Sequence, residues 1–344
     1  MSFFYNTEYR SYDMIISKRQ MEETALKTLD QKAYQEVRTW MHRNARELEL
    51  ALWKFHFEGG SREEVVQALA CYQNEDGGFS STIEPDIWNP ESAPYSAVVV
   101  TGILRGIGFL DNEGAAHPVV QGILRYLDSG VHSDEAGWHF SVPSNDLYAH
   151  APWWSYSEES NRVQDLGLTA TLCAFVLGYA DRDSALFQKA AGYTKQILEK
   201  VSDTEDLGEM GAGGVLALLG EIMRTGLADS FECGSLMEKM AAAVNQRIER
   251  NPEKWAGYTP RPSEFIPSTE SPFYKGNEEI VEKELDYLVE TRNPGGVWNI
   301  TWNWFNLGEK YAKEFAISEN WWMGVKAIDI MLFLRNFGRI SAPV

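Results

Sequence analysis

The chain has 344 residues, 44% of them hydrophobic and 24% charged, so it can bury a large core and is not expected to be disordered. Its 50 acidic and 31 basic side chains give a formal net charge of −19, which argues against nucleic-acid partners and anionic membrane surfaces because both require clustered Lys and Arg. The three cysteines lie far apart, the N-terminus lacks a signal-peptide pattern, and no apolar run reaches the roughly 18 residues of a transmembrane helix. We therefore expect a cytoplasmic protein without integral membrane association. It should form a single domain over residues 1–344, with an N-terminal extension at 1–30.

Hydrophobic residues recur at helical spacing along most of the chain. Amphipathic, charged helices are predicted at 34–57, 61–74, 117–129, 184–201, 233–250 and 278–291. Ser61 and Glu64 have the spacing of a capping box at the start of the second of these helices. Helices that are apolar nearly all round are predicted at 95–110, 166–180, 211–223 and 321–337. A helix without a polar face must be surrounded by other helices, so the two kinds should alternate in space.

This alternation predicts an all-α fold, and specifically an α/α toroid. Such a toroid is a double ring of about five to six helical hairpins, with apolar inner and charged outer helices. An open solenoid of stacked hairpins is the competing arrangement. The stretch 272–291 supplies a short inner helix, an outer helix or both.

Long connecting loops repeat one layout, which favours the ring. The repeated loops lie near 76–95, 136–153, 256–273 and 295–321, and copies recur at about 60 residues or twice that interval. Each begins with glycine followed by an aromatic residue that is expected to fold back as a plug: Phe79, Trp138, Tyr258 and Trp298. The first three loops also carry an acidic residue and then a proline, which suits the first turn of a following helix.

The segment Gln73-Asn74-Glu75-Asp76-Gly77-Gly78-Phe79 resembles the QW repeat of squalene–hopene cyclases and the related repeat of protein prenyltransferase β subunits. In that superfamily the Gln closes an outer helix, Asp-Gly-Gly makes the turn and the aromatic residue stacks on the Gln. The later copies keep the aromatic residue, with Asp128 and Glu290 near the Gln position. The resemblance implies an α/α toroid with a large central cavity, over most of the chain.

The resemblance does not carry a catalytic residue with it. The DxDD acid motif of triterpene cyclases and the DDxxD diphosphate motif of other terpene synthases are absent from this sequence. The zinc site of protein prenyltransferases needs an Asp two residues before a Cys, and here Leu69, Thr171 and Phe231 occupy those positions. The thioester motif of complement-like toroids is also missing, so the match predicts the fold and not the chemistry.

Loops at one rim of a ring frame its cavity, so the repeated loops are where we look for function. The catalytic candidates are the acids that recur at one loop position: Asp86, Asp146 and Glu264. A carboxyl beside aromatic residues loses hydration, and its raised pKa suits a general acid. The alternative is that these acids accept hydrogen bonds from backbone N–H groups of their own loops. The substrate-binding candidates are Trp88, His139, His150, Trp153, Trp154 and Tyr156. No metal site and no cofactor are predicted, because His139 and His150 fit no standard metal spacing.

Three functions remain open from the sequence. The first is a terpenoid-cyclase-like toroid that binds or transforms a hydrophobic or extended substrate in an aromatic-lined cavity. The second is a carbohydrate-active α/α barrel, either a glycoside hydrolase or a polysaccharide lyase, which uses the loop carboxylates. The third is a non-catalytic binding or scaffold protein. The expected partner is a small molecule or an oligosaccharide, and the oligomeric state is left open.

Overall fold

The computed structural model describes residues 26–341, except 112–113, 204–206, 232 and 234–235. Within these ranges the chain forms twelve α-helices and no β-strand, which confirms the predicted all-α class. Most of the extension predicted at residues 1–30 lies outside the described residues. None of the described helices is both long enough and apolar enough to cross a lipid bilayer.

Amphipathic and apolar helices alternate along the chain. The amphipathic helices are α2 (Gln31–Asn44), α4 (Arg62–Ala70), α6 (Pro118–Asp128), α8 (Ala185–Asp203), α10 (Leu236–Arg247) and α11 (Glu278–Glu290). The apolar helices are α3 (Glu47–Phe57), α5 (Pro94–Gly106), α7 (Glu158–Tyr179), α9 (Gly208–Arg224) and α13 (Ala312–Asn336), with the short α12 (Phe305–Lys310) before the last. The capping box of Ser61 and Glu64 is present at the start of α4, as predicted.

The segment predicted as one helix over 34–57 is in fact two helices, α2 and α3. The chain leaves helical geometry at Ala45 and Arg46, both of which have extended backbone angles. The Arg46 guanidinium pairs with Glu49 and donates to the carbonyl oxygens of Thr82 and Ile83, at 3.0 Å each. This contact with a segment far along the chain is a tertiary effect that helical periodicity does not show. As a result α3 is a fifth apolar helix beyond the four predicted.

The segment between α10 and α11 decides an alternative that the sequence left open. The residues at 248–277 contain only two short 3-10 helices, η6 (Pro252–Lys254) and η7 (Pro262–Glu264), so no apolar helix lies between these two amphipathic ones. The stretch 272–291 supplies α11 alone. Proline does begin α5, at Pro94, but Pro272 lies in a turn and begins no helix.

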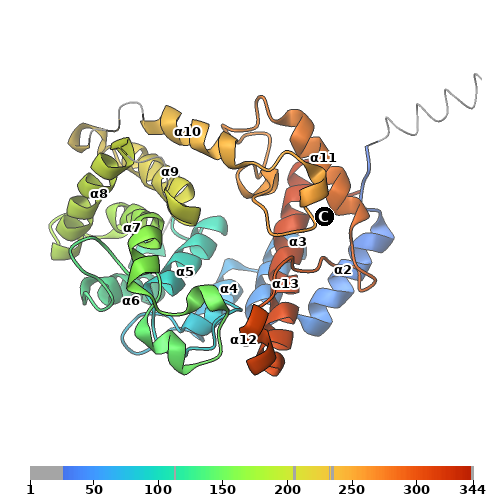
Figure 1. Cartoon of the computed structure of the whole chain (residues 1–344), viewed down its shortest axis with the longest axis horizontal. Coiled ribbons are helices and arrows are strands. Elements are labelled where there is room, and N and C mark those ends of the chain that lie inside the picture. The colour runs from blue at the N-terminus through green and yellow to red at the C-terminus, as the bar shows by residue number, and fades with distance from the viewer. Residues whose placement is uncertain (1–25, 112–113, 204–206, 232, 234–235, 342–344) are drawn as a thin grey trace, which may run out of the picture.

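The helices lie in two groups that share α3. In Figure 1, α4–α9 lie on the left and α2, α3, α11 and α13 on the right, with α10 along the top between them. Helix α7 packs against α5, α8 and α9, while α13 packs against α2 and α3. The larger hydrophobic core includes Leu48 of α3 and the smaller core includes Trp53 of the same helix. One helix therefore joins the two cores.

Two of the repeated loops begin with the same turn. In the turn at 74–78, the N–H of Asn74 donates to the carbonyl of Gly78 (2.8 Å). The N–H of Gly77 in turn donates to the carbonyl of Asn74 (2.9 Å). In the turn at 293–297 the same two hydrogen bonds measure 2.7 and 2.9 Å. Gly77 and Gly296 occupy the fourth position with φ of 89° and 91°, a region that favours glycine. The loop at 295–321, which diverges in sequence, is thus close to the first loop in its turn.

The first turn is fixed against α6. The Gln73 side-chain amide donates to the carbonyls of Gly77 (2.9 Å) and Val119 (3.0 Å). A Cβ atom at Gly77 would lie 2.3 Å from the carbonyl oxygen of Gly122 on α6. This turn therefore needs glycine both for its backbone angles and for its close approach to the helix.

Replacing Gly77 with Ala is expected to lower the free energy of unfolding by about 3 kcal/mol, through a left-handed backbone penalty and a clash with α6. Gly59→Ala is the matched control, because Gly59 has φ of 72° but nothing within 4 Å of its Cβ position. The control should lose only about 1 kcal/mol. Urea denaturation of both variants measures the difference. Equal losses would show that the approach to α6 contributes nothing.

The two ends of the described chain lie side by side. Leu29 donates its N–H to the carbonyl of Arg339 and accepts from the N–H of Ser341, both at 2.8 Å. The Arg339 side chain is buried, at 1% exposed, and pairs with Glu282 and Asp286 of α11. These contacts join the start of α2 to the segment that follows α13.

Candidate functional site

The carboxylate of Asp86 is the centre of the most unusual polar arrangement in the described structure. Its two oxygens accept hydrogen bonds from the indole N–H groups of Trp302 (3.0 Å) and Trp304 (2.7 Å). Asp86 follows the short helix η1 (Ser81–Ile83), whereas both tryptophans precede α12. Asp86 is 1% exposed, and burial raises the pKa of its carboxyl while the indole N–H groups oppose the rise.

A third indole approaches the same carboxyl group. The N–H of Trp322, on α13, also lowers the pKa of Asp86, yet its geometry falls short of a hydrogen bond. It has no other acceptor among the described residues. The Trp322 ring meets Trp302 edge to face, with 5.1 Å between the ring centroids. Three tryptophans from the C-terminal part of the chain therefore surround one N-terminal carboxylate.

Glu84, two residues before Asp86, is a buried carboxyl that holds its proton at neutral pH. Its pKa is raised to about 8, chiefly by burial and then by the charge of Asp86. The charges of Arg46 and Lys326 and the backbone N–H of Asp86 oppose this rise. We call Glu84, Asp86, Trp302, Trp304 and Trp322 the acid–tryptophan site. It joins one carboxyl that is protonated at neutral pH to one that accepts hydrogen bonds from two indole N–H groups.

An aromatic and cationic wall adjoins this site. Trp88 stacks on Trp321 with 5.3 Å between centroids, and its indole N–H donates to Ser318 on α13. The Arg46 guanidinium lies over the Trp321 ring, 5.1 Å from its centroid. Because Arg46 also binds the carbonyls of Thr82 and Ile83, it fixes the backbone that carries Glu84.

Lys326 of α13 connects the acid–tryptophan site to two further carboxyls. Its ammonium lies over the Trp302 ring, at 5.7 Å from the centroid. The same charge opposes the rise in pKa of Glu264 and Asp329, which burial causes in both. Glu264 and Asp329 are nevertheless exposed to water. Neighbouring protein atoms therefore restrict the hydration of both carboxyls, although water still reaches them.

The structure treats the three predicted catalytic acids differently. Asp86 belongs to the acid–tryptophan site and Glu264 lies near it through Lys326. The Asp146 carboxylate, by contrast, accepts the backbone N–H of Tyr156 at 3.0 Å and lies 3.7 Å from His150. It makes contacts within its own loop, which is the alternative that the sequence left open.

The aromatic residues predicted to bind substrate also lie in different places. Trp88 is part of the wall beside the acid–tryptophan site. Trp154 is buried and stacks on Phe140, with 4.7 Å between centroids, so it packs the loop itself. Trp153 is 38% exposed, while Tyr156 is half-buried and contributes its backbone N–H to Asp146.

The two loop histidines do not converge. The His139 ring nitrogen Nδ1 lies 3.2 Å from the carboxylate of Asp165 on α7. The His150 ring contacts the Tyr148 carbonyl (2.8 Å) and the Ser155 hydroxyl (3.0 Å), so both nitrogens have partners in its own loop. No group of three or more metal-binding side chains gathers within the described ranges.

Of the predicted plugs, Phe79, Trp138 and Trp298 are buried. Tyr258 is not: it is 67% exposed and meets Trp302 edge to face. Trp255 takes its place, fully buried, with its indole N–H donating to the Glu249 carbonyl at 3.0 Å. The predicted plug in the third loop was therefore wrong by three positions.

Removing the Asp86 carboxylate tests how far the indole contacts stabilise the fold. Asp86→Ala is expected to lower the free energy of unfolding by about 2 kcal/mol, because two buried indole N–H groups lose their acceptor. Relief of the buried charge offsets part of this loss. Asp146→Ala is the control, since that exposed carboxylate accepts one backbone N–H, and it should cost less than about 1 kcal/mol. Urea denaturation measures both, and an Asp86→Ala variant as stable as the parent would contradict the assignment.

Neither a scan against protein-family models nor searches of the curated proteins and of the solved structures found a match for this chain. The resemblance to the QW repeat remains an expectation about architecture.

Proposed function

We propose that this protein is a carbohydrate-active enzyme that hydrolyses glycosidic bonds, with Glu84 as the general acid. The observation that carries the proposal is the acid–tryptophan site itself. It joins two neighbouring carboxyls to indole rings and to a lysine. Sugar-binding sites need this combination, because indole faces pack on the C–H groups of a sugar ring and charged side chains bind its hydroxyls.

In this mechanism Glu84 donates its proton to the glycosidic oxygen as the bond to the anomeric carbon breaks. The Asp86 carboxylate, held by two indole N–H groups, stabilises the positive charge that develops on the sugar. A second carboxylate removes a proton from the attacking water, which adds to the anomeric carbon. We assign this role to Glu264, because water reaches it and it accepts one weak backbone hydrogen bond among the described residues, from the N–H of Arg261 at 3.3 Å.

The chemistry of Glu84 favours this function over terpenoid cyclisation. Protonation of an isolated carbon–carbon double bond requires a strong acid, whereas a carboxyl with a pKa of about 8 is a weak one. A weak acid is suited to protonating a leaving oxygen whose basicity rises as its bond breaks. Lys326, Glu264 and Asp329 beside the site would also be costly to desolvate against a hydrocarbon substrate.

We further propose the α/α toroid as the overall arrangement. Two contacts support it. The turn after α4 packs on the next amphipathic helix, α6, and the equivalent turn after α11 packs on α2, where a Cβ at Gly296 would lie 2.9 Å from the Glu36 Cβ. Packing of the last turn on the first amphipathic helix is what a closed ring requires and what an open solenoid lacks.

The test is incubation of the full chain with a panel of neutral and acidic oligosaccharides, followed by mass spectrometry of the products. Hydrolysis adds one water to each cleaved bond and should occur with the parent but not with Glu84→Gln. Products with a new double bond and no added water would instead indicate a polysaccharide lyase. Failure to cleave any member of the panel would favour a non-catalytic binding protein.

A further inference from the structure

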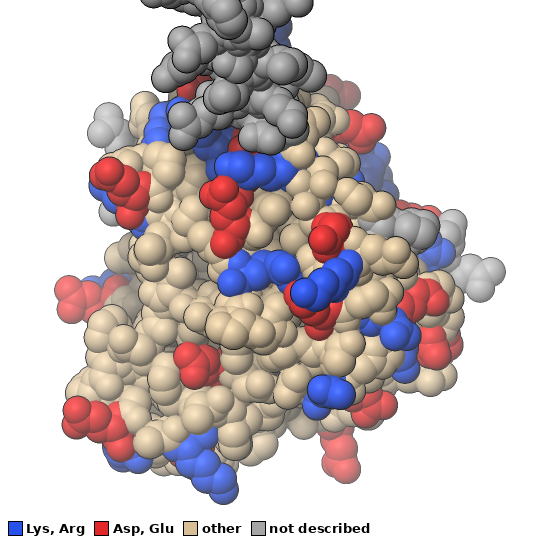
Figure 2. Space-filling model, turned by 90° about the vertical axis from the view of Figure 1, so that its right-hand side faces the viewer, with Lys and Arg blue, Asp and Glu red and all other residues tan. Residues whose placement is uncertain are grey.

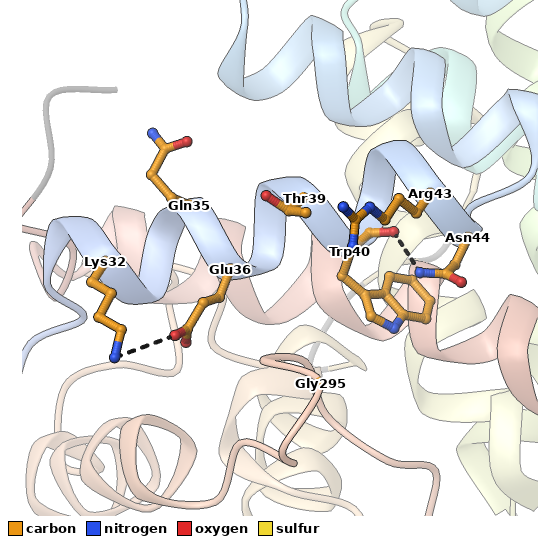
Figure 3. A pocket seen from close by; sticks show the side chains of 8 residues that line it. All are labelled: Lys32, Gln35, Glu36, Thr39, Trp40, Arg43, Asn44 and Gly295. Carbon is orange, nitrogen blue, oxygen red and sulfur yellow. Dashed lines mark hydrogen bonds and ion pairs between the residues drawn. The ribbon is translucent and has the colours of Figure 1, made fainter.

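A groove lies between α2 and the turn at 293–297. Two adjoining hollows of about 480 Å³ each form it, and both are shallow and open to solvent. Trp40 and Gly295 line both. In Figure 3, Trp40 and the pair Lys32–Glu36 project from α2 on the side of Gly295. We call this the Trp40 groove.

The last turn contacts its helix through a longer side chain than the first turn does. At the first turn, the Gln73 amide bridges Gly77 and Val119 directly. At the last turn, Arg292 takes the position of Gln73 and binds the Gly296 carbonyl (3.2 Å) and the Glu36 carboxylate (3.1 Å). Here a Cβ at Gly295 would make only ordinary contact with Trp40, at 3.5 Å.

Trp40 offers an indole that no described side chain covers fully. Its ring is half-buried and packs in part against the smaller hydrophobic core, and it forms no aromatic pair or cation contact among the described residues. No described residue accepts a hydrogen bond from its indole N–H, which is not fully buried. A ligand in the groove could therefore both stack on the ring and accept this N–H.

The charges around the groove balance, although the chain as a whole is strongly acidic. Lys32 and Arg43 oppose Glu36 and Glu319, and the other polar lining groups are neutral: Gln35, Thr39, Asn44, Asn293 and Asn299. Figure 2 shows the side of the molecule that carries α2 and α11, where acidic and basic side chains are interspersed over a largely uncharged surface. A phosphate or a polyanion would need an excess of cations, which this groove lacks.

We infer that the Trp40 groove is a second carbohydrate site, which binds a neutral sugar of a polymer by stacking on Trp40. An open indole beside hydrogen-bonding amides and balanced charges suits an uncharged, polyhydroxylated ring. The inference depends on the proposed function for its polymer but uses none of the residues of the acid–tryptophan site. Its role is to hold a long substrate on the protein while another part of the chain is cleaved.

The experiment is native electrophoresis through gels that contain starch, xylan, mixed-linkage β-glucan or galactomannan. The parent protein should be retarded by at least one of them. Trp40→Ala should raise the apparent Kd for that polymer by at least about tenfold, and Trp40→Phe by less, because a smaller ring still stacks. Met237→Ala, which changes an exposed side chain on α10, is the surface control and should migrate as the parent does.

Glu84→Gln separates this inference from the proposed function. It should lose hydrolysis but keep full retardation. If Glu84→Gln still hydrolyses its substrate while Trp40→Ala alone loses retardation, the proposed acid is wrong and the groove stands. If no polymer retards the parent, or if Trp40→Ala is retarded as strongly as the parent, the inference about the groove is overturned. Equal thermal melting of the Trp40 variants and the parent excludes unfolding as the cause.

Discussion

Replacing Glu84 with Gln is expected to lower kcat/KM for glycoside hydrolysis by about 10²- to 10⁴-fold. The amide keeps the shape of the side chain but has no proton to donate to the leaving oxygen. With the parent protein, activity should fall as pH rises through about 8, because Glu84 then loses its proton. Initial rates over a pH series, for parent and variant, measure both effects.

A buried carboxyl far from the site provides the control for this variant. Glu221 is 3% exposed and pairs with Arg224 and Arg105, so Glu221→Gln likewise replaces a buried carboxyl with an amide. Its rate per folded molecule should match that of the parent. If Glu84→Gln retained the parent's rate and alkaline limb, Glu84 would not be the acid, and another carboxyl such as Asp329 would have to supply the proton.

The second large effect is a pH dependence of the free energy of unfolding, which arises from the raised pKa of Glu84. Its pKa is about 8 in the folded protein and near the ordinary 4.5 in the unfolded chain. Below pH 4.5 both states hold the proton. Between the two values only the folded state holds it, so stability falls with rising pH by up to about 1.4 kcal/mol per pH unit. Above about 8 the protein has lost the whole contribution, a few kcal/mol, because it must then bury the charge.

Urea denaturation of the parent and of Glu84→Gln, compared from pH 4 to pH 9, isolates the contribution of Glu84 to the free energy of unfolding. The difference between the two should move in favour of the variant between about pH 4.5 and pH 8 and level off above that range. The groups that face Glu84 are Asp86, Arg46 and Lys326. Asp86 has a raised pKa too, so its loss of a proton acts in the same direction. A constant difference between parent and variant would mean that Glu84 has no raised pKa.

The sequence was sufficient for most of the helices because their apolar residues recur at a regular spacing. It was also sufficient for the capping box at Ser61, whose two contacts lie within four residues. It did not reveal the break at Arg46, since the cause is a contact with carbonyls at Thr82 and Ile83. It also placed the third plug at Tyr258, because the glycine and aromatic pattern there points to the wrong one of two neighbouring aromatic residues.

The candidate site shows the same division between local and distant contacts. Asp86 and Glu264 were singled out because they recur at one loop position. Nothing local distinguishes Glu84, whose raised pKa depends on burial and on Asp86. Nor does any local pattern join Asp86 to Trp302 and Trp304, which follow it by more than 200 residues. Only the packing of the C-terminal segment on the N-terminal loop brings them together.

The contact between Leu29 and the segment around Arg339 has a consequence for the order of folding. Helices α2 and α3 are the first described helices to leave the ribosome, yet α13, on which both pack, is the last. This contact closes a loop of nearly the whole described chain. Because closing so long a loop costs much chain entropy, the contact forms late in folding. During synthesis the residues of α13 that complete the smaller core around Met41 and Trp53 are therefore missing until the end. The larger core forms from consecutive helices, so it can assemble first. The two ends of the chain then pack together beside it.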